Sequence, residues 1–271
     1  MQILNTAHAD LGALATASKG AYQHAAPFPN IHFSNFFDDA FLNRVLEEFP
    51  DLSATRDAKR YNNHNEVKLA GIGEQTFGFP TKLLVHYLNS EPFLLFLQEL
   101  TGIRETLLPD PYLEGGGHHE IKSGGLLKIH ADFNKSRRSG LDRRINVLVY
   151  LNKDWQDSWG GHFELWDKDM KGCVASIPPY FNTMAIFSTT DFSFHGHPDA
   201  LACPPDRSRK SIALYYYSNG RPASEISDRE EHGTLFRGRA GVADDARTST
   251  LKNIARDWLP PVITRALRKK R

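Results

Sequence analysis

The sequence has little cysteine, no long apolar run and almost no net charge, and each scarcity excludes a class of protein. Two cysteines, Cys173 and Cys203, cannot build a disulfide framework or an all-cysteine zinc site. No uncharged apolar stretch approaches the ~20 residues that a membrane-spanning helix needs, and the first residues show no secretion signal. We therefore expect a cytoplasmic protein.

The net charge of +1 is unevenly distributed along the chain. Residues 251–271 contain seven basic side chains and one acidic side chain, which leaves the rest of the chain near −5. A nucleic-acid-binding protein is therefore not expected. The terminal sequence DWLPPVITRALRKKR predicts a basic amphipathic helix. It is either a weak contact for an anionic membrane surface or a partner, or a solvated terminal helix.

Residue patterning divides the chain into three stretches. Residues 1–26 are rich in alanine and polar side chains and predict a loosely held helix. Residues 27–220 predict a single domain, whose second half, at about 110–220, forms a β-rich core. Residues 221–271 turn polar and form a C-terminal extension that ends in the basic helix.

The first half of the domain predicts one strand followed by helices. PFPNIHFSNFF combines β-branched and aromatic residues in the manner of a strand. Asp38 and Asp39 can cap a following helix, in which apolar residues recur at helical spacing up to Pro50. A further helical pattern covers residues 81–100 and is interrupted near Pro92.

From about Gly115 onward, short β-type runs alternate with Gly, Asn, Asp and Pro. The runs are HHEIK, LLKIHADF, RINVLVYLN, GHFELWD, CVASI, NTMAIFS, FSFHG and RKSIALYYYS. Seven or eight short strands at this spacing are typical of a β-sandwich or barrel and not of βαβ units. Helices followed by strands predict an α+β fold, in which an antiparallel double sheet carries the early helices on its outside.

One of three His-x-Asp triplets is distinguished by its context. About one triplet is expected by chance in a chain with 12 histidines. The triplet at 8–10 lies in the soft N-terminal stretch, and the triplet at 197–199 contains a proline, which disfavours an internal strand. His130-Ala131-Asp132 ends the apolar run LLKI, and residues i and i+2 of a strand project from one face. His130 and Asp132 can therefore bind one metal ion together.

A histidine from another strand would complete this pair. Two imidazoles and one carboxylate form the facial triad of non-haem Fe(II) oxygenases, which leaves three coordination positions open. His195, which follows a strand-like run and lies among aromatic residues, is the favoured third ligand. His197 is the competitor, although it enters the turn at Pro198.

A carboxylate-binding group is predicted beside these residues. Arg209 and Ser211 share one face of their strand by spacing, and together they can hold a carboxylate. The strand RINVLVYLN has an apolar face that should pack under the helices, formed by Ile145, Val147, Val149 and Leu151. Its other face points into the barrel and carries Arg144, Asn146, Leu148 and Tyr150. Tyr150 is then placed to donate its hydroxyl to the same carboxylate as Arg209.

The chain resembles the 2-oxoglutarate- and Fe(II)-dependent oxygenases of the prolyl 4-hydroxylase type in the ordered segments HADFN, RRINVLVYLNKDW, GGHFELW, FHGHP and SRKSIALYYY. The resemblance covers about residues 110–218 and implies a double-stranded β-helix (jelly-roll) core. It implies iron ligation by His130, Asp132 and His195. It also implies that the distal carboxylate of 2-oxoglutarate binds to Arg209, Tyr150 and Ser211. A tyrosine that many relatives carry before the His-x-Asp is absent, since this chain reads HHEI there, so part of the cosubstrate pocket must differ.

The activity implied by the resemblance is hydroxylation of an unactivated C–H bond, coupled to oxidative decarboxylation of 2-oxoglutarate to succinate and CO2. The implied cofactors are Fe(II), 2-oxoglutarate and O2, with ascorbate as a candidate reductant. The expected substrate is a peptidyl proline or a small metabolite, and candidate contacts to it are Asn134, Arg144, Asn146 and Trp166. Two alternatives stay open. A cupin-like metal-dependent hydrolase or isomerase would not need Arg209 and Ser211, and a non-catalytic jelly-roll binding module would have a damaged triad.

Overall fold

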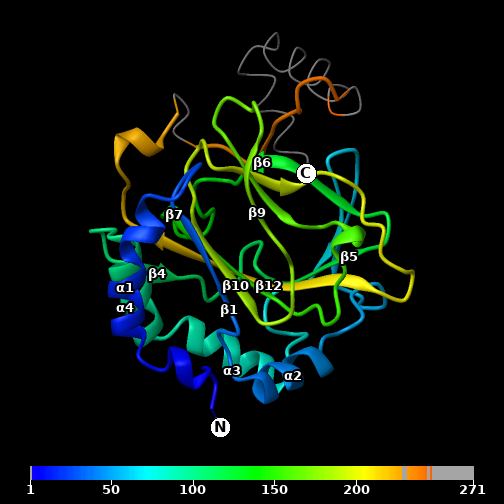
Figure 1. Ribbon diagram of the computed structural model, residues 1–271, viewed down its shortest axis with the longest axis horizontal. Coiled ribbons are helices and arrows are strands. Elements are labelled where there is room, and N and C mark those ends of the chain that lie inside the picture. The colour runs from blue at the N-terminus through cyan, green and yellow to red at the C-terminus, as the bar shows by residue number, and fades with distance from the viewer. Residues whose placement is uncertain (1, 228–230, 243–244, 246–271) are drawn as a thin grey trace.

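The computed structural model describes residues 2–227, 231–242 and 245 (Figure 1). The α-helices within these residues are α1 (Leu11–Gln23), α2 (Asp39–Glu47), α3 (Phe79–Leu88) and α4 (Glu91–Thr101). The strands of the first half are β1 (Asn30–Ser34), β2 (Lys59–Asn62), β3 (Glu66–Ala70) and β4 (Leu108–Pro109). The remaining strands are β5 (Gly117–Lys122), β6 (Leu126–Ala131), β7 (Asp142–Tyr150), β8 (Phe163–Trp166), β9 (Cys173–Ile177), β10 (Thr183–Ser188), β11 (Phe194–His197), β12 (Ser208–Ser218) and β13 (Leu235–Phe236).

These strands pair antiparallel in one sheet with the order β1-β10-β7-β12-β5-β3-β6-β11-β8-β9. Outside this order, β2 pairs with β3, β4 pairs with β12 and β13 pairs with β6. The sheet folds back on itself, so that β6, β11, β8 and β9 face β10, β7 and β12. The ring of Phe163 in β8 lies 5.0 Å from that of Phe187 in β10, which marks the interior between the two walls. The predicted α+β fold with a jelly-roll core is confirmed, and all eight predicted runs from HHEIK to RKSIALYYYS are strands.

Strand β7 separates two cores. Its residues Ile145, Val147 and Val149 are fully buried in the cluster that also contains the apolar side chains of α1–α4. Figure 1 shows these helices gathered along one side and below the barrel. On the opposite face, Tyr150 packs with Phe163 and other residues inside the barrel. The predicted two faces of this strand are therefore correct for its C-terminal half.

A side-chain cap, a proline and a glycine mark helix ends in this chain. The Asp38 side chain accepts a hydrogen bond from Phe41 N at 2.8 Å, as expected of a helix cap. The predicted interruption near Pro92 separates α3 from α4, and Pro92 lies in the first turn of α4. Gly102 ends α4 with φ of 70°, a conformation that glycine adopts without strain.

Helix α1 is packed more firmly than its composition predicts. Leu11, Ala15 and Tyr22 are buried, and α1 lies against α4. The Tyr22 hydroxyl lies 2.8 Å from Ser188 Oγ at the end of β10. The expectation of a loosely held segment at 1–26 is therefore not met, because a narrow apolar stripe among alanines is enough to dock this helix.

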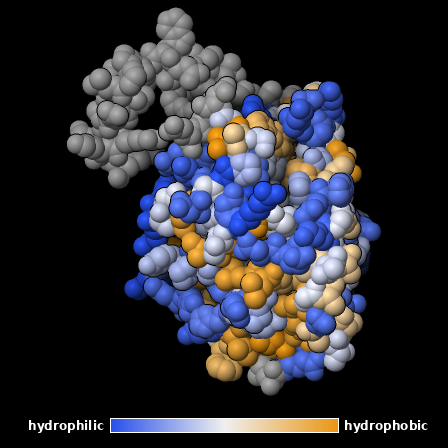
Figure 2. All heavy atoms as spheres, turned by 90° about the vertical axis from the view of Figure 1, so that its left-hand side faces the viewer, coloured by the Kyte–Doolittle hydropathy of each residue, from blue (hydrophilic) through white to orange (hydrophobic). Residues whose placement is uncertain are grey.

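The side of the molecule that carries α1 and α4 has an apolar surface in its lower part (Figure 2). Leu95 of α4 is 58% exposed there, beside a groove that Leu11, Tyr87 and Phe96 also line. Among the described residues, no helix has the length and apolar character that crossing a membrane requires. The basic helix expected within 251–271 lies outside the described residues.

Candidate metal centre

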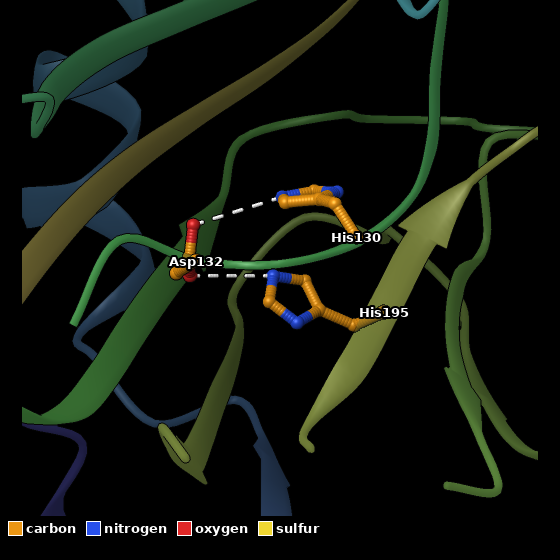
Figure 3. A group of neighbouring side chains, drawn as sticks. All are labelled: His130, Asp132 and His195. Atoms are coloured by element: carbon orange, nitrogen blue, oxygen red, sulfur yellow. Dashed lines mark ion pairs between the residues drawn. The ribbon is translucent and has the colours of Figure 1, made fainter. Parts of the chain in front are cut away.

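Three predicted ligands converge at one end of the barrel interior (Figure 3). His195 of β11 stands directly opposite His130 of β6 in the strand ladder, and Asp132 follows β6 immediately. Asp132 Oδ1 lies 3.6 Å from His130 Nε2, and Asp132 Oδ2 lies 3.4 Å from His195 Nε2. One ligand atom from each residue can be chosen so that all lie within 4.8 Å of one another. In the described part of the chain, no other group of histidine, cysteine or carboxylate side chains meets this criterion.

Backbone carbonyls orient both imidazoles. His130 Nδ1 lies 2.8 Å from Lys128 O, and His195 Nδ1 lies 2.9 Å from Ser193 O. A proton on each Nδ1 satisfies these carbonyls and leaves the Nε2 lone pair directed toward the centre. Burial and the neighbouring His195 lower the pKa of His130, which favours its neutral imidazole. Neutral imidazoles are the form that binds a metal ion.

The Asp132 carboxylate is held in its charged form. Arg143 Nη2 donates to Oδ2 at 3.0 Å, and Asn146 Nδ2 donates to the same oxygen at 2.7 Å. Burial alone would raise the pKa of Asp132, but the Arg143 guanidinium and the two imidazoles hold it well below its usual range. Two neutral nitrogens and one carboxylate oxygen are the donor set of non-haem Fe(II) sites, so these residues fit a ferrous ion.

Arg143 takes the position that the strand spacing predicts for Arg144. The ladder between β7 and β12 shifts after Tyr216, so that Tyr217 opposes Arg143 and Arg144 has no partner. Arg143 therefore turns inward and stacks on the ring of Tyr215, 3.4 Å from its centroid. The prediction of Arg144 on the inner face is corrected accordingly. The Arg144 guanidinium instead donates to Glu105 and Glu225 at 3.0 and 3.4 Å, away from the candidate metal ligands.

A buried guanidinium lies farther along the same interior. Arg209 is 5% exposed, donates through Nε to Gly161 O at 2.7 Å and through Nη2 to Tyr150 Oη at 3.2 Å. No carboxylate of the described residues pairs with it. Ser211, the next inward residue of β12, opposes Tyr150 in the ladder. The sequence-based grouping of these three residues is thus reproduced in space.

Phe163 and Phe187 contact the His195 imidazole and pack with Tyr150, over whose ring the Arg209 guanidinium lies. The two aromatic rings pack in one cluster with Tyr150, and their centroids lie 5.3 and 4.7 Å from the His195 ring. They line the interior with apolar surface. A molecule that reaches from the candidate metal ligands to Arg209 would therefore lie in surroundings with little water.

The remaining candidate substrate contacts are engaged with the protein itself. Asn146 holds both Asp132 and Arg143. Asn134 Oδ1 accepts the His232 backbone N–H at 3.0 Å. Trp166 opposes Phe194 in the β8–β11 ladder, and both lie on the face opposite His195. Trp166 therefore faces away from the candidate metal ligands, which corrects the expectation that it faces the substrate.

Sequence patterning did not identify the C-terminal strand β13. It pairs with β6, so that Phe236 stands opposite His130, and the two rings lie 5.5 Å apart. Only the apolar pair Leu235-Phe236 in polar surroundings marks this strand in the sequence. Residues of the stretch 221–271 thus return to the barrel beside the candidate metal centre.

Comparison with known proteins finds a family model that resembles part of this arrangement. Residues 116–217 match the family model of the 2OG-Fe(II) oxygenase superfamily. The match covers less than half of the chain and includes all three candidate ligands. The Fe(II) in the name of that superfamily agrees with the donor set described above.

The curated relative is distant. The prolyl 3,4-dihydroxylase OGFOD1 of Ostreococcus tauri is 25% identical over 214 residues, which are 72% of this chain and 39% of that protein. The chain thus spans about two fifths of the length of this relative.

Solved structures share the fold. A Pseudomonas putida prolyl-4-hydroxylase is 12% identical with a TM-score of 0.54, and covers 76% of this chain and 100% of its own. A Trichoplax adhaerens prolyl hydroxylase, solved with a hypoxia inducible factor peptide fragment, is 19% identical with a TM-score of 0.55, and covers 77% of this chain and 90% of its own.

Proposed function

We propose that the protein is a 2-oxoglutarate- and Fe(II)-dependent dioxygenase that hydroxylates an unactivated C–H bond. The observation that carries this proposal is the buried guanidinium of Arg209, which has no carboxylate partner among the described residues. A buried charge without a counter-charge is costly, so this position fits an anion that binds from outside. A dicarboxylic acid that also reaches the metal would supply that anion.

His130, Asp132 and His195 are the proposed iron ligands. Iron bound there would supply O2 activation and oxidative decarboxylation of 2-oxoglutarate to succinate and CO2, coupled to hydroxylation. Arg143 and Asn146 hold the Asp132 carboxylate charged and oriented. The two backbone carbonyls at 128 and 193 fix the imidazole tautomers.

Arg209, Tyr150 and Ser211 are the proposed groups for the distal carboxylate of 2-oxoglutarate. The guanidinium supplies charge-assisted hydrogen bonds, and the Tyr150 hydroxyl, which accepts from Arg209, can donate its own proton to a carboxylate oxygen. The apolar rings of Phe163 and Phe187 keep this interaction out of water, which strengthens it.

The proposed substrate is a prolyl residue of a peptide, with a small metabolite as the alternative. Support comes from the relatives, which are named as prolyl hydroxylases. The cupin-like and non-catalytic alternatives predict no turnover of 2-oxoglutarate.

The test is a measurement of succinate release from 2-oxoglutarate by protein loaded anaerobically with Fe(II), screened against proline-containing peptides and metabolites. The wild type should form succinate and a product heavier by one oxygen atom. His130→Ala and Asp132→Ala should form neither, and His86→Ala, at an exposed histidine of α3, should behave as the wild type. Equal succinate release from wild type and Asp132→Ala would overturn the proposal.

A further inference from the structure

His197 is a buried histidine that the proposed chemistry does not yet use. It is 3% exposed, and neither ring nitrogen has a hydrogen-bond partner in the structure. Buried polar groups in folded proteins nearly always have partners. An imidazole with two unsatisfied nitrogens therefore points to a ligand that completes it.

The position of His197 follows from an irregularity in β11. The β11–β6 ladder shifts between His195 and His197, so that His195 opposes His130 whereas His197 opposes Leu127. His197 is consequently absent from the group of converging ligand atoms at Asp132. It occupies a different level of the barrel, although it follows a proposed ligand by only two residues.

A cavity beside His197 locates this level. Its lining includes His197 and Gly161. The Gly161 carbonyl accepts a hydrogen bond from Arg209 Nε at 2.7 Å. His197 therefore lies beside the segment that holds the Arg209 guanidinium at the proposed carboxylate site.

We infer that His197 is a further cosubstrate-binding residue, which donates an N–H hydrogen bond to the 2-oxoglutarate carboxylate bound by Arg209. This inference rests on the proposed function. An imidazole in either protonation state offers at least one N–H donor, and a carboxylate oxygen is the acceptor that Arg209 attracts to this place. The bond satisfies one nitrogen of His197, and it links the ligand to β11 as well as β12.

Ligand binding can distinguish a cosubstrate-binding role of His197 from a purely structural role. A hydrogen bond to the distal carboxylate helps only ligands that have this group. His197 should therefore contribute to the binding of 2-oxoglutarate, and it should contribute nothing to the binding of 2-oxovalerate, which has the same 2-oxo acid end and a methyl group in place of the carboxylate.

The test compares His197→Gln, which keeps a donor, with His197→Met, which has similar bulk and none. Calorimetric titration of the Mn(II)-loaded full chain gives the Kd for 2-oxoglutarate and for 2-oxovalerate. We expect the Met variant to bind 2-oxoglutarate about 10-fold more weakly than wild type, and the Gln variant within about 3-fold of it, since tenfold corresponds to one lost hydrogen bond of this kind. The Kd for 2-oxovalerate and for Mn(II) should not change in either variant, and His86→Met, at an exposed histidine of α3, is the control.

An unchanged 2-oxoglutarate Kd in His197→Met, or an equal weakening for both 2-oxo acids, would overturn the inference. If the Met variant does not fold, the Gln variant decides alone, because loss of 2-oxoglutarate selectivity over 2-oxovalerate in a variant that keeps the donor contradicts the assignment. Failure of the proposed function has a different signature: wild-type protein would bind Mn(II) but would not bind 2-oxoglutarate.

Discussion

Arg143 Nη2 lies 3.0 Å from Asp132 Oδ2, and this contact binds the carboxylate of the candidate metal centre to a guanidinium that is 1% exposed. The guanidinium is itself clamped over the Tyr215 ring and donates to Asn146. The charge, orientation and position of Asp132 are therefore set by its protein neighbours. Substitution of Arg143 tests how much they contribute to metal binding.

Replacing Arg143 by Met should weaken metal binding. Without the guanidinium, burial raises the pKa of Asp132 and the carboxylate loses an orienting donor, so we expect an affinity for Mn(II) lower by about 10- to 100-fold. Calorimetry measures it. Arg144→Met is the control: it should lower the free energy of unfolding by about 2 kcal/mol, because Arg144 pairs with Glu105 and Glu225, and leave the Mn(II) affinity unchanged. The reverse pattern would show that the two arginines have been assigned wrongly.

Replacing Arg209 by Met should abolish 2-oxoglutarate binding and spare the metal. We expect the Kd for 2-oxoglutarate in Mn(II)-loaded protein to rise at least about 100-fold, and Arg209→Lys to lose less because it keeps the charge without the planar fork. The metal-free Met variant should lose no more than about 1 kcal/mol of unfolding free energy, since it removes an uncompensated buried charge. A strongly destabilised variant that still binds 2-oxoglutarate would indicate a structural role.

Gly161 should be required for the position of Arg209. Its φ is +75°, and an added Cβ would lie 2.6 Å from Leu201 Cδ2 and 3.0 Å from Arg209 Cδ. We expect Gly161→Ala to weaken 2-oxoglutarate binding about 10-fold and to cost about 1–3 kcal/mol of stability through backbone strain. Gly160→Ala, with φ of +70° and open space around the added Cβ, should cost stability alone. Equal effects of both variants on the Kd would contradict this explanation.

The ion pair between His232 and Asp191 should make stability depend on pH. His232 Nε2 lies 2.8 Å from Asp191 Oδ1. Burial would lower the pKa of His232, but Asp191 raises it above its usual value. Burial would raise the pKa of Asp191, but His232 and Ser227 lower it to about 2. The contribution of His232 is complete below the unfolded pKa of about 6.5 and is lost as the pH rises through the folded value, whereas that of Asp191 is lost as the pH falls from about 4 toward about 2.

Urea unfolding of wild type, His232→Gln, Asp191→Asn and the double variant measures this pair. The coupling free energy should be about 1 kcal/mol between about pH 4 and about pH 6.5, and it should decline on both sides. A coupling that grows from pH 6.5 to pH 9 would refute the assignment of a charged His232.

Much of the fold could be predicted because the strands from β5 to β12 are rich in β-branched and aromatic residues and are separated by turn-forming residues. The hairpin of β2 and β3 escaped prediction, since KRYN and EVKLA carry too many charges to show a strand pattern. Strand β3 pairs with β5 and β6, and β2 pairs with β3. This pairing is a tertiary effect that no local pattern records.

Regular strand alternation allowed the candidate metal centre to be predicted, and a break in that alternation prevented the prediction of Arg143. Alternation along a regular strand places His130 and Asp132 on one side, and the regular part of β7 places Asn146 and Tyr150 on one face. The bulge near Arg144 breaks this alternation, and it depends on the partner strand β12. Trp166 was placed on the wrong face because the register of β8 against β11 is likewise set by pairing and not by composition.

The pairing of β13 with β6 affects how this protein can be shortened. Leu235 and Phe236 cover the backbone of β6 at Ala131 and His130, and Asp245 pairs with Lys128 of the same strand at 3.2 Å. A chain cut after residue 217, where the family match ends, would leave this part of β6 as an open edge that invites pairing with a second copy. Expression of this barrel without self-association therefore requires the residues up to at least Asp245.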